Sequence, residues 1–409
     1  MPIVFVHGVA VRTQAAFPGI KEMLWQYVAP KIAPQGRARD VTIYTPYWAP
    51  FGATFAWNRA SLPGNVVRER APVAPSPAPE RAIMLSGEQL ALAATPSVQR
   101  GLRARQQPPV LATVAQLSEL LSGIAAAQVL FDPSAAFDAQ TARAAIALDA
   151  AAHEFVPGGA TEITPEFLDK IGARANEIYS QDGVAQRAGS PIGAVISGAK
   201  QIVGAVEDGA GDLLSILVLK YRPQINEGLT NFFGDVFVYM AKRGDAGTPG
   251  PIVKTILDAL LSAVNGPKVT PDEPLVILSH SMGGQIVYDL ITYFMDGIPE
   301  LKHASIKLWA AAASQVGLFE EMKLFKVSDP RYSAANHNKA PFPPARLDRW
   351  YNVWDPDDIL SYTAAPIFQV PPGSNRFVDR PFSSHLSVFK AHGGYLVSPA
   401  FYQAMAKML

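Results

Sequence analysis

Residues 275–284 read Leu-Val-Ile-Leu-Ser-His-Ser-Met-Gly-Gly, an apolar run followed by a turn of small residues. The four aliphatic residues at 275–278 predict a short strand that is buried on both faces, as in a parallel sheet. Beyond the turn, apolar residues recur at helical spacing at positions 286, 287, 290, 291 and 294. The stretch therefore predicts a buried strand, a tight turn that carries Ser281, and a helix.

A strand, a tight turn with one serine and a helix together make up the nucleophile-elbow pattern. Such a turn strains the serine backbone and presents its Oγ at the end of a sheet, while the helix N-terminus favours developing negative charge. Strand and helix approach closely, so small residues are needed two positions before and after the serine. Here these are Ser279, in place of the usual glycine, and Gly283. The alternative is a chance turn of small residues, since such a motif is a hypothesis until its context supports it.

Composition restricts the class of protein. The chain has 409 residues, of which 49% are hydrophobic and 17% charged, which favours a packed globule with a large core or two domains. Its 35 Lys and Arg balance 35 Asp and Glu, so we expect no nucleic-acid partner. The absence of cysteine excludes disulfides, thiolate metal sites and cysteine nucleophiles, and it suits a reducing cytosol.

The N-terminal residues predict neither a signal peptide nor a membrane span. Residues 1–8 lack a basic segment and enter an apolar strand at once, and no run of 18 residues is free of polar groups. The nearest such run, Val110–Phe131, is interrupted by Glu119 and is interpreted as a buried or interfacial helix. We therefore expect a cytoplasmic protein, with export by a signal-independent route left open.

The pattern of elements predicts an α/β protein with an insertion. The first fifty residues indicate strand, helix and strand at 3–6, 18–29 and 41–47. Between 51 and 221 the chain is rich in Ala, Gly and Pro, and helices are expected at 110–129, at 135–155, from Thr164, and near 192–206. From 223 the α/β pattern returns, with a helix at 251–264, strands at 305–312, 349–354 and 376–382, and a final helix at 399–409.

These elements predict a doubly wound, mostly parallel sheet interrupted by a large, mainly helical cap. Residues 1–50 and 222–409 would form the core, and residues 51–221 the cap. Amphipathic cap helices could cover an acyl chain or contact a lipid surface, or could simply pack on the core. Aromatic residues gather at the junction and could line a pocket mouth or pack there: Trp48, Phe51, Phe55 and Trp57.

A serine nucleophile needs a base and an orienting acid, which follow it in the order Ser, Asp or Glu, His. Acid candidates occur directly after the predicted strand 349–354, at Asp355, Asp357 and Asp358. We assign Asp358, because the apolar residues 359–360 that follow it could anchor the loop. Asp355 stays open as the alternative acid, and all three could instead be solvated turn residues.

Only two histidines lie beyond these acids, His385 and His392. We assign His392 as the base, because Ala-His-Gly-Gly-Tyr at 391–395 indicates a loop of small residues before the final helix. Such a loop could bring the imidazole over the sheet toward Ser281. His385 is interpreted as a surface-loop residue.

An oxyanion hole requires backbone N–H groups that point to the developing negative charge. One donor follows the nucleophile and is Met282, and the second should come from the loop after an early strand. His7-Gly8-Val9 ends the first predicted strand, so Val9 N–H is the second candidate. His7 and His280 are interpreted as supporting residues.

Taken together, His-Gly after the first strand, Ser-His-Ser-Met-Gly-Gly, Asp-Pro-Asp-Asp and Ala-His-Gly-Gly-Tyr resemble the α/β-hydrolase superfamily. The likeness is to lipase- and serine-esterase-like members, some of which share a segment similar to Phe233-Gly234-Asp235-Val236 with Tyr239. It covers about residues 1–50 and 223–409, without the insertion. The resemblance implies a Ser281–His392–Asp358 triad, an acyl-enzyme, and no metal or organic cofactor.

The expected function is hydrolysis of carboxylic esters of small molecules or lipids, as in a lipase, phospholipase or esterase. A triad does not reveal the leaving group, so a thioesterase or amidase is the first alternative. The second alternative is a non-catalytic scaffold of the same fold that binds a partner or a membrane.

Overall fold

The computed structural model describes residues 1–33, 36–62, 111–113, 117, 120–121, 124, 139–156, 160–181, 192–207, 213–266, 273–370, 375–384 and 388–409. A six-stranded sheet lies at its centre, in the order β10-β9-β8-β7-β1-β2, and all of its strand pairs are parallel. The strands are β1 (Ile3–Val6), β2 (Ile43–Tyr44), β7 (Leu275–His280), β8 (Ile306–Ala312), β9 (Trp350–Trp354) and β10 (Phe377–Pro381).

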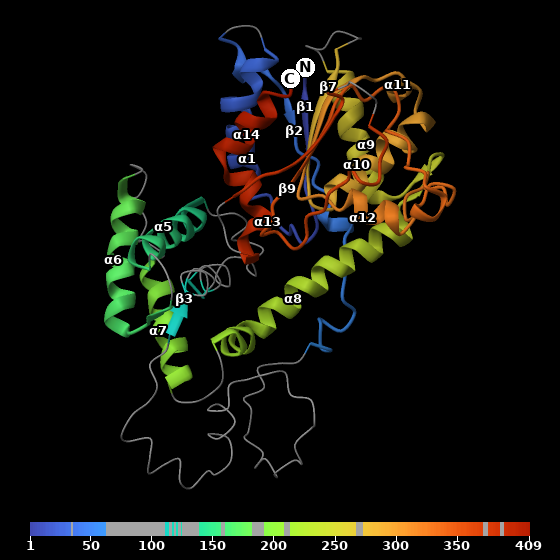
Figure 1. Cartoon of the computed structure of the whole chain (residues 1–409). Helices are drawn as coiled ribbons and strands as arrows, with labels where there is room; N and C mark the ends of the chain where they lie inside the picture. Colours follow the sequence, from blue (N-terminus) through green and yellow to red (C-terminus); the bar gives the residue numbers. More distant parts are fainter. Residues whose placement is uncertain are drawn as a thin grey trace.

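Helices cover both faces of this sheet (Figure 1). Successive strand residues point to opposite faces, so Val4 packs with α9 (Pro251–Val264) and α10 (Gly283–Thr292). Ile3 and Phe5 pack on the other face with α1 (Phe17–Met23) and α14 (Pro399–Ala406). Burial on both faces explains why the strands are continuous apolar runs, and the core is an α/β layer structure, as predicted.

Most predicted core elements are confirmed, including α9 at the expected residues 251–264. The helix expected at 18–29 is α1 followed by a π turn, Leu24–Val28, and a 3-10 turn, Ala29–Lys31. The strand expected at 41–47 is shortened to the edge strand β2, which pairs only with β1 among the described strands. Shorter core elements complete this part: Ala38–Asp40, Ala49–Phe51, β5 (Gly244–Asp245), β6 (Thr248–Pro249), Phe294–Gly297, α11 (Pro299–Lys302), α12 (Val316–Glu321), Ala334–Asn336 and α13 (Val388–Val397).

Three helices between the two parts of the core share a separate apolar cluster: α5 (Ala139–Phe155), α6 (Pro165–Gln181) and α7 (Ile192–Glu207). Thr164 caps α6 as expected, because its Oγ1 accepts a hydrogen bond of 3.1 Å from Phe167 N–H. The helix predicted to begin at Val110 is wrong at its start. Residues Leu111–Thr113 form β3, which pairs antiparallel with β4 (Ala160–Glu162).

The chain returns to the core through α8 (Leu213–Lys242), a helix of 30 residues that reaches from this helical region to the sheet (Figure 1). The predicted boundary at 221–222 therefore lies within a continuous helix. Across the described ranges, no helix combines the length and apolar character needed to cross a bilayer.

Candidate active site

Ser281 occupies a strained turn between β7 and α10. Its φ of +54° is in the left-handed region, which costs a non-glycine residue about 1–2 kcal/mol. The turn is held by Ser281 N–H, which donates 2.9 Å to Ala312 O in β8. A Cβ at Gly283 would overlap Val6 O, so the helix can approach β1 only with glycine at this position. The surrounding sheet thus maintains the elbow geometry that the sequence predicts.

Ser279 takes the place of the first glycine in the usual pattern. Its side chain is buried, and its Oγ accepts a hydrogen bond of 2.8 Å from Trp309 Nε1–H on the neighbouring strand. A buried indole N–H needs an acceptor, and glycine would leave it without this one. The serine that replaces the usual glycine at position 279 therefore supplies the acceptor that Trp309 needs.

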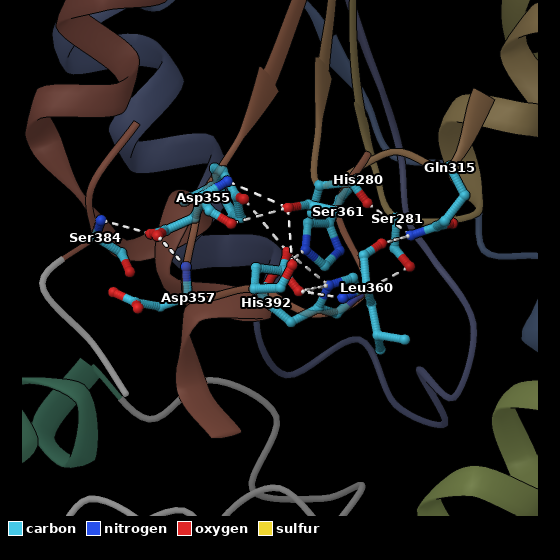
Figure 2. A network of polar contacts seen from close by, with 12 residues as sticks. His280, Ser281, Gln315, Asp355, Asp357, Leu360, Ser361, Ser384 and His392 are labelled. Atoms are coloured by element: carbon cyan, nitrogen blue, oxygen red, sulfur yellow. Dashed lines mark hydrogen bonds and ion pairs between the residues drawn. The ribbon is translucent and has the colours of Figure 1, made fainter. Parts of the chain in front are cut away.

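Three side chains that are distant in sequence meet at this elbow, and Figure 2 shows two of them, Ser281 and His392. His392 Nε2 lies 2.9 Å from Ser281 Oγ, and His392 Nδ1 lies 3.0 Å from both Oδ1 and Oδ2 of Asp358. A carboxylate can only accept, so Nδ1 carries the proton and the Nε2 lone pair faces the hydroxyl. The hydroxyl, imidazole and carboxylate are thereby connected in series. The side chain of Asp358 is 1% exposed and that of His392 is 20% exposed.

His392 does not lie in a loop, and this part of the prediction is wrong. It lies within α13, where Ala391 and Tyr395 are fully buried on either side of it. Two consecutive glycines favour a loop by propensity, but packing against the sheet overrides this weak preference. The other candidate base, His385, is outside the described residues.

The acid beside His392 is Asp358, and Asp355 has a different set of contacts. Asp355 Oδ1 accepts 3.0 Å from Asp357 N–H, and its Oδ2 accepts 2.7 Å from Ser384 N–H. Asp355 therefore holds its own turn and the segment after β10. Of the two residues expected to anchor this loop, Ile359 is 71% exposed, whereas Leu360 is half-buried and its backbone oxygen accepts a hydrogen bond from Gln315 Nε2.

The Asp358 carboxylate is stabilised in its charged form. Burial raises its pKa, but the nearby His392 and the Leu360 N–H, which donates 3.0 Å to Oδ1, outweigh burial and leave the pKa below its usual value. Tyr395 OH also donates to Oδ2 at 3.3 Å, a contact that the sequence analysis missed. Burial and the Asp358 charge raise the pKa of Tyr395, so its hydroxyl remains a donor. The helical spacing that places residues 392 and 395 on one face was hidden, because the sequence analysis interpreted 391–395 as a loop.

The loop after β1 lies against the elbow. A Cβ on Gly8 would be 2.6 Å from Ser281 Cβ, so only glycine permits this contact. Val9 follows directly, and Met282 is the N-cap residue of α10. Among the described residues, neither Val9 N–H nor Met282 N–H donates a hydrogen bond to another protein group. Both predicted donors therefore belong to segments that touch at Ser281.

His7 supports this loop as a neutral residue. Its Nε2 accepts 3.2 Å from Trp48 N–H, which places the proton on Nδ1, 2.8 Å from Gly8 O. Its ring stacks on the Trp48 indole with centroids 4.6 Å apart, and burial lowers its pKa to about 4. His7 thus braces the end of β1.

His280 is likewise a supporting residue. Its Nε2–H donates 2.6 Å to the backbone oxygen of His392, so it tethers α13 to the elbow. Burial, followed by the proximity of His392, lowers its pKa to about 3. A neutral donor in this position holds the backbone of residue 392 without exchanging protons itself.

These two histidines predict loss of stability in mild acid. Burial lowers their pKa values to about 4 and 3 in the folded state, against an ordinary value of 6.5, so the unfolded chain binds more protons between these limits. The free energy of unfolding should therefore fall as pH drops below 6.5, by about 2 kcal/mol per histidine between pH 7 and 5. His280→Gln keeps a donor near the Nε2 position and should reduce this pH-dependent loss of stability by the contribution of one histidine, about 2 kcal/mol.

Denaturant unfolding of both proteins at pH 7 and pH 5 measures the difference. The exposed His303 provides the control, since His303→Gln should retain the full wild-type pH dependence. Equal pH dependence in wild type and His280→Gln would show that this histidine is not held neutral.

The four junction aromatics do not share one role. Trp48 is buried against His7, whereas Phe51 is 46% and Trp57 is 83% exposed. Phe55 lines a groove of about 420 Å³ along α8, with Leu62, Asn226, Leu229, Thr230, Phe233, Gly234 and Phe237. Within the described part of the chain, no group of three or more His, Asp or Glu residues could hold a metal ion.

Comparison of the chain with models of protein families, with curated proteins and with solved structures gives no match. A function has to be inferred from the residues themselves.

Proposed function

We propose that the protein is a serine hydrolase of carboxylic esters, of lipase, phospholipase or esterase type. The observation that carries the proposal is the series of contacts from Ser281 Oγ to His392 Nε2, at 2.9 Å, and from His392 Nδ1 to Asp358, at 3.0 Å. Nucleophile, base and orienting acid within hydrogen-bond distance are the signature of nucleophilic acyl transfer.

In the proposed reaction, Ser281 Oγ attacks the acyl carbon while His392 Nε2 takes the hydroxyl proton. The Asp358 carboxylate holds Nδ1–H and stabilises the imidazolium that forms. Val9 N–H and Met282 N–H donate to the oxyanion. His392 then passes its proton to the leaving alcohol, and activates a water molecule that releases the acid from the acyl-enzyme.

The architecture supports assignment to the α/β-hydrolase fold. The nucleophile follows a central parallel strand, and the acid and base follow β9 and β10 in the expected chain order. Residues 51–221 would be a cap, which the separate apolar cluster of α5, α6 and α7 supports. The cysteine-free composition suits a cytoplasmic location, which is part of the proposal.

The apolar character of the junction favours a hydrophobic ester. The groove along α8 is lined by Phe55, Phe233 and the largely exposed Phe237, and Trp57, two residues after Phe55, is also largely exposed. Such an apolar surface would bind the acyl group of a hydrophobic ester, including a lipid. It would also favour contact with a lipid surface.

Labelling with a fluorophosphonate probe tests the proposal. The probe should form one adduct, which peptide mass spectrometry should locate at Ser281, and p-nitrophenyl esters of increasing acyl length should be hydrolysed. Parallel assays with thioesters and amides decide the leaving group. Faster turnover of thioesters or amides would replace the esterase assignment, and a folded protein that neither reacts nor hydrolyses would be a binding scaffold.

A further inference from the structure

The carboxylate of Asp235 lies where three segments of the chain meet. It is fully buried and accepts four hydrogen bonds. Oδ2 accepts 2.9 Å from Ala10 N–H and 2.8 Å from Arg12 Nη1. Oδ1 accepts 2.9 Å from Arg12 Nη2 and 2.7 Å from Ala53 N–H. One residue of α8 therefore binds both the loop after β1 and the segment that leads into residues 51–221.

Close packing fixes the distance between α8 and this segment. A Cβ at Gly52 would overlap Asp235 Oδ1, and a Cβ at Gly234 would be 2.6 Å from Ala53 Cβ. The segment then continues along α8, where Arg59 Nη2 donates 2.7 Å to Asn231 Oδ1. Movement of the segment relative to α8 would therefore displace the carboxylate.

The bond to Ala10 bears directly on the neighbouring amide of Val9. Ala10 has a φ of +59°, a strained value for a non-glycine residue. Holding Ala10 N–H fixes the peptide plane between residues 9 and 10, which limits rotation of the preceding plane that carries Val9 N–H. Arg12 is anchored to the same carboxylate, so both ends of residues 10–12 are held.

We propose that Asp235 is a positioning residue that orients Val9 N–H as an oxyanion donor and links it to the segments that flank residues 51–221. The inference rests on the proposed serine hydrolysis. A misaligned donor weakens binding of the transition state more than binding of the substrate, so kcat should fall while KM changes little. If the role of the carboxylate were purely structural, its replacement would lower stability without lowering kcat selectively.

The test compares Asp235→Asn with a matched variant, Asp289→Asn. Asp289 is also fully buried, pairs with Arg243 Nη1 at 2.7 Å and accepts 3.0 Å from Lys326 N–H, but within the described residues it forms no hydrogen bond or ion pair with residues 8–12. Both variants lose a buried ion pair and should be destabilised. Only Asp235→Asn should lose kcat, by about 10- to 100-fold, less than the loss of a whole oxyanion donor.

An alkylboronic acid provides the second readout, because its tetrahedral serine adduct mimics the charged intermediate. Its affinity should fall in Asp235→Asn by the same factor as kcat, with KM within about 2-fold of wild type. Gly52→Ala, which would push on the carboxylate from the other segment, should cause a smaller loss of the same kind. It also keeps the proposal testable if Asp235→Asn does not fold.

Each outcome has one meaning. If wild type neither turns over esters nor binds the boronic acid, the proposed function fails first. If wild type does both, and Asp235→Asn keeps wild-type kcat and boronate affinity or loses no more than Asp289→Asn, the positioning role is wrong while the proposed function stands.

Discussion

Ser281→Ala is expected to lower ester turnover by roughly 10⁴- to 10⁶-fold, because it removes the only atom that can form the acyl-enzyme. Residual activity would come from binding and from the oxyanion donors alone. Fluorophosphonate labelling should disappear with turnover. The free energy of unfolding should change little, since alanine meets the same strain as serine at a φ of +54°.

Ser279→Ala is the matched control, since Ser279 lies two residues before Ser281, within the buried strand β7. It would leave Trp309 Nε1–H without its acceptor, which costs about 1–3 kcal/mol of stability. Labelling at Ser281 and most of the turnover should remain. Initial rates with p-nitrophenyl esters, together with thermal unfolding of both variants, separate the two effects. Wild-type turnover in Ser281→Ala would rule out this residue as the nucleophile.

The parts of the site that could be predicted from sequence are those fixed by local pattern and by strand order. Parallel strands end at one edge of a sheet, so residues that follow β1, β7 and β9 must lie near one another. This placed Gly8, Ser281 and Asp358 correctly without any knowledge of the helices between them. The apolar runs at 3–6 and 275–278 predicted two buried strands, and in the structure β1 and β7 form there and pair in parallel.

The parts that could not be predicted depend on contacts between distant residues. Arg12 and Asp235 are separated by 223 positions, and nothing local in either segment indicates the other. His392 lies beside Ser281, as expected, but it was assigned to the wrong element, because two glycines disfavour a helix that packing nevertheless maintains. Asp358 was chosen for an apolar anchor at 359–360, of which Ile359 is exposed and Leu360 is half-buried, whereas hydrogen bonds of Asp355 and Ser361 hold the turn.

The second large effect is expected for Asp358→Asn, with about 10⁴-fold lower kcat. The asparagine amide would face His392 Nδ1 and favour the tautomer that is protonated at Nε2, which cannot accept the proton of Ser281. Asp355→Asn should behave differently, because the Asp355 carboxylate accepts from the backbone N–H groups of Asp357 and Ser384 and, among the described residues, not from His392. It should lose about 1–3 kcal/mol of stability but less than about 10-fold in kcat.

The pair of variants therefore decides which carboxylate orients the base. Single-turnover rates with an activated ester, measured beside unfolding free energies, report chemistry and stability separately. Fluorophosphonate labelling of Asp358→Asn should slow in parallel with kcat, since the same proton must leave Ser281 in both reactions. A larger kcat loss in Asp355→Asn than in Asp358→Asn, at equal stability, would transfer the role to Asp355 and would require the turn at 355–361 to rearrange when substrate binds.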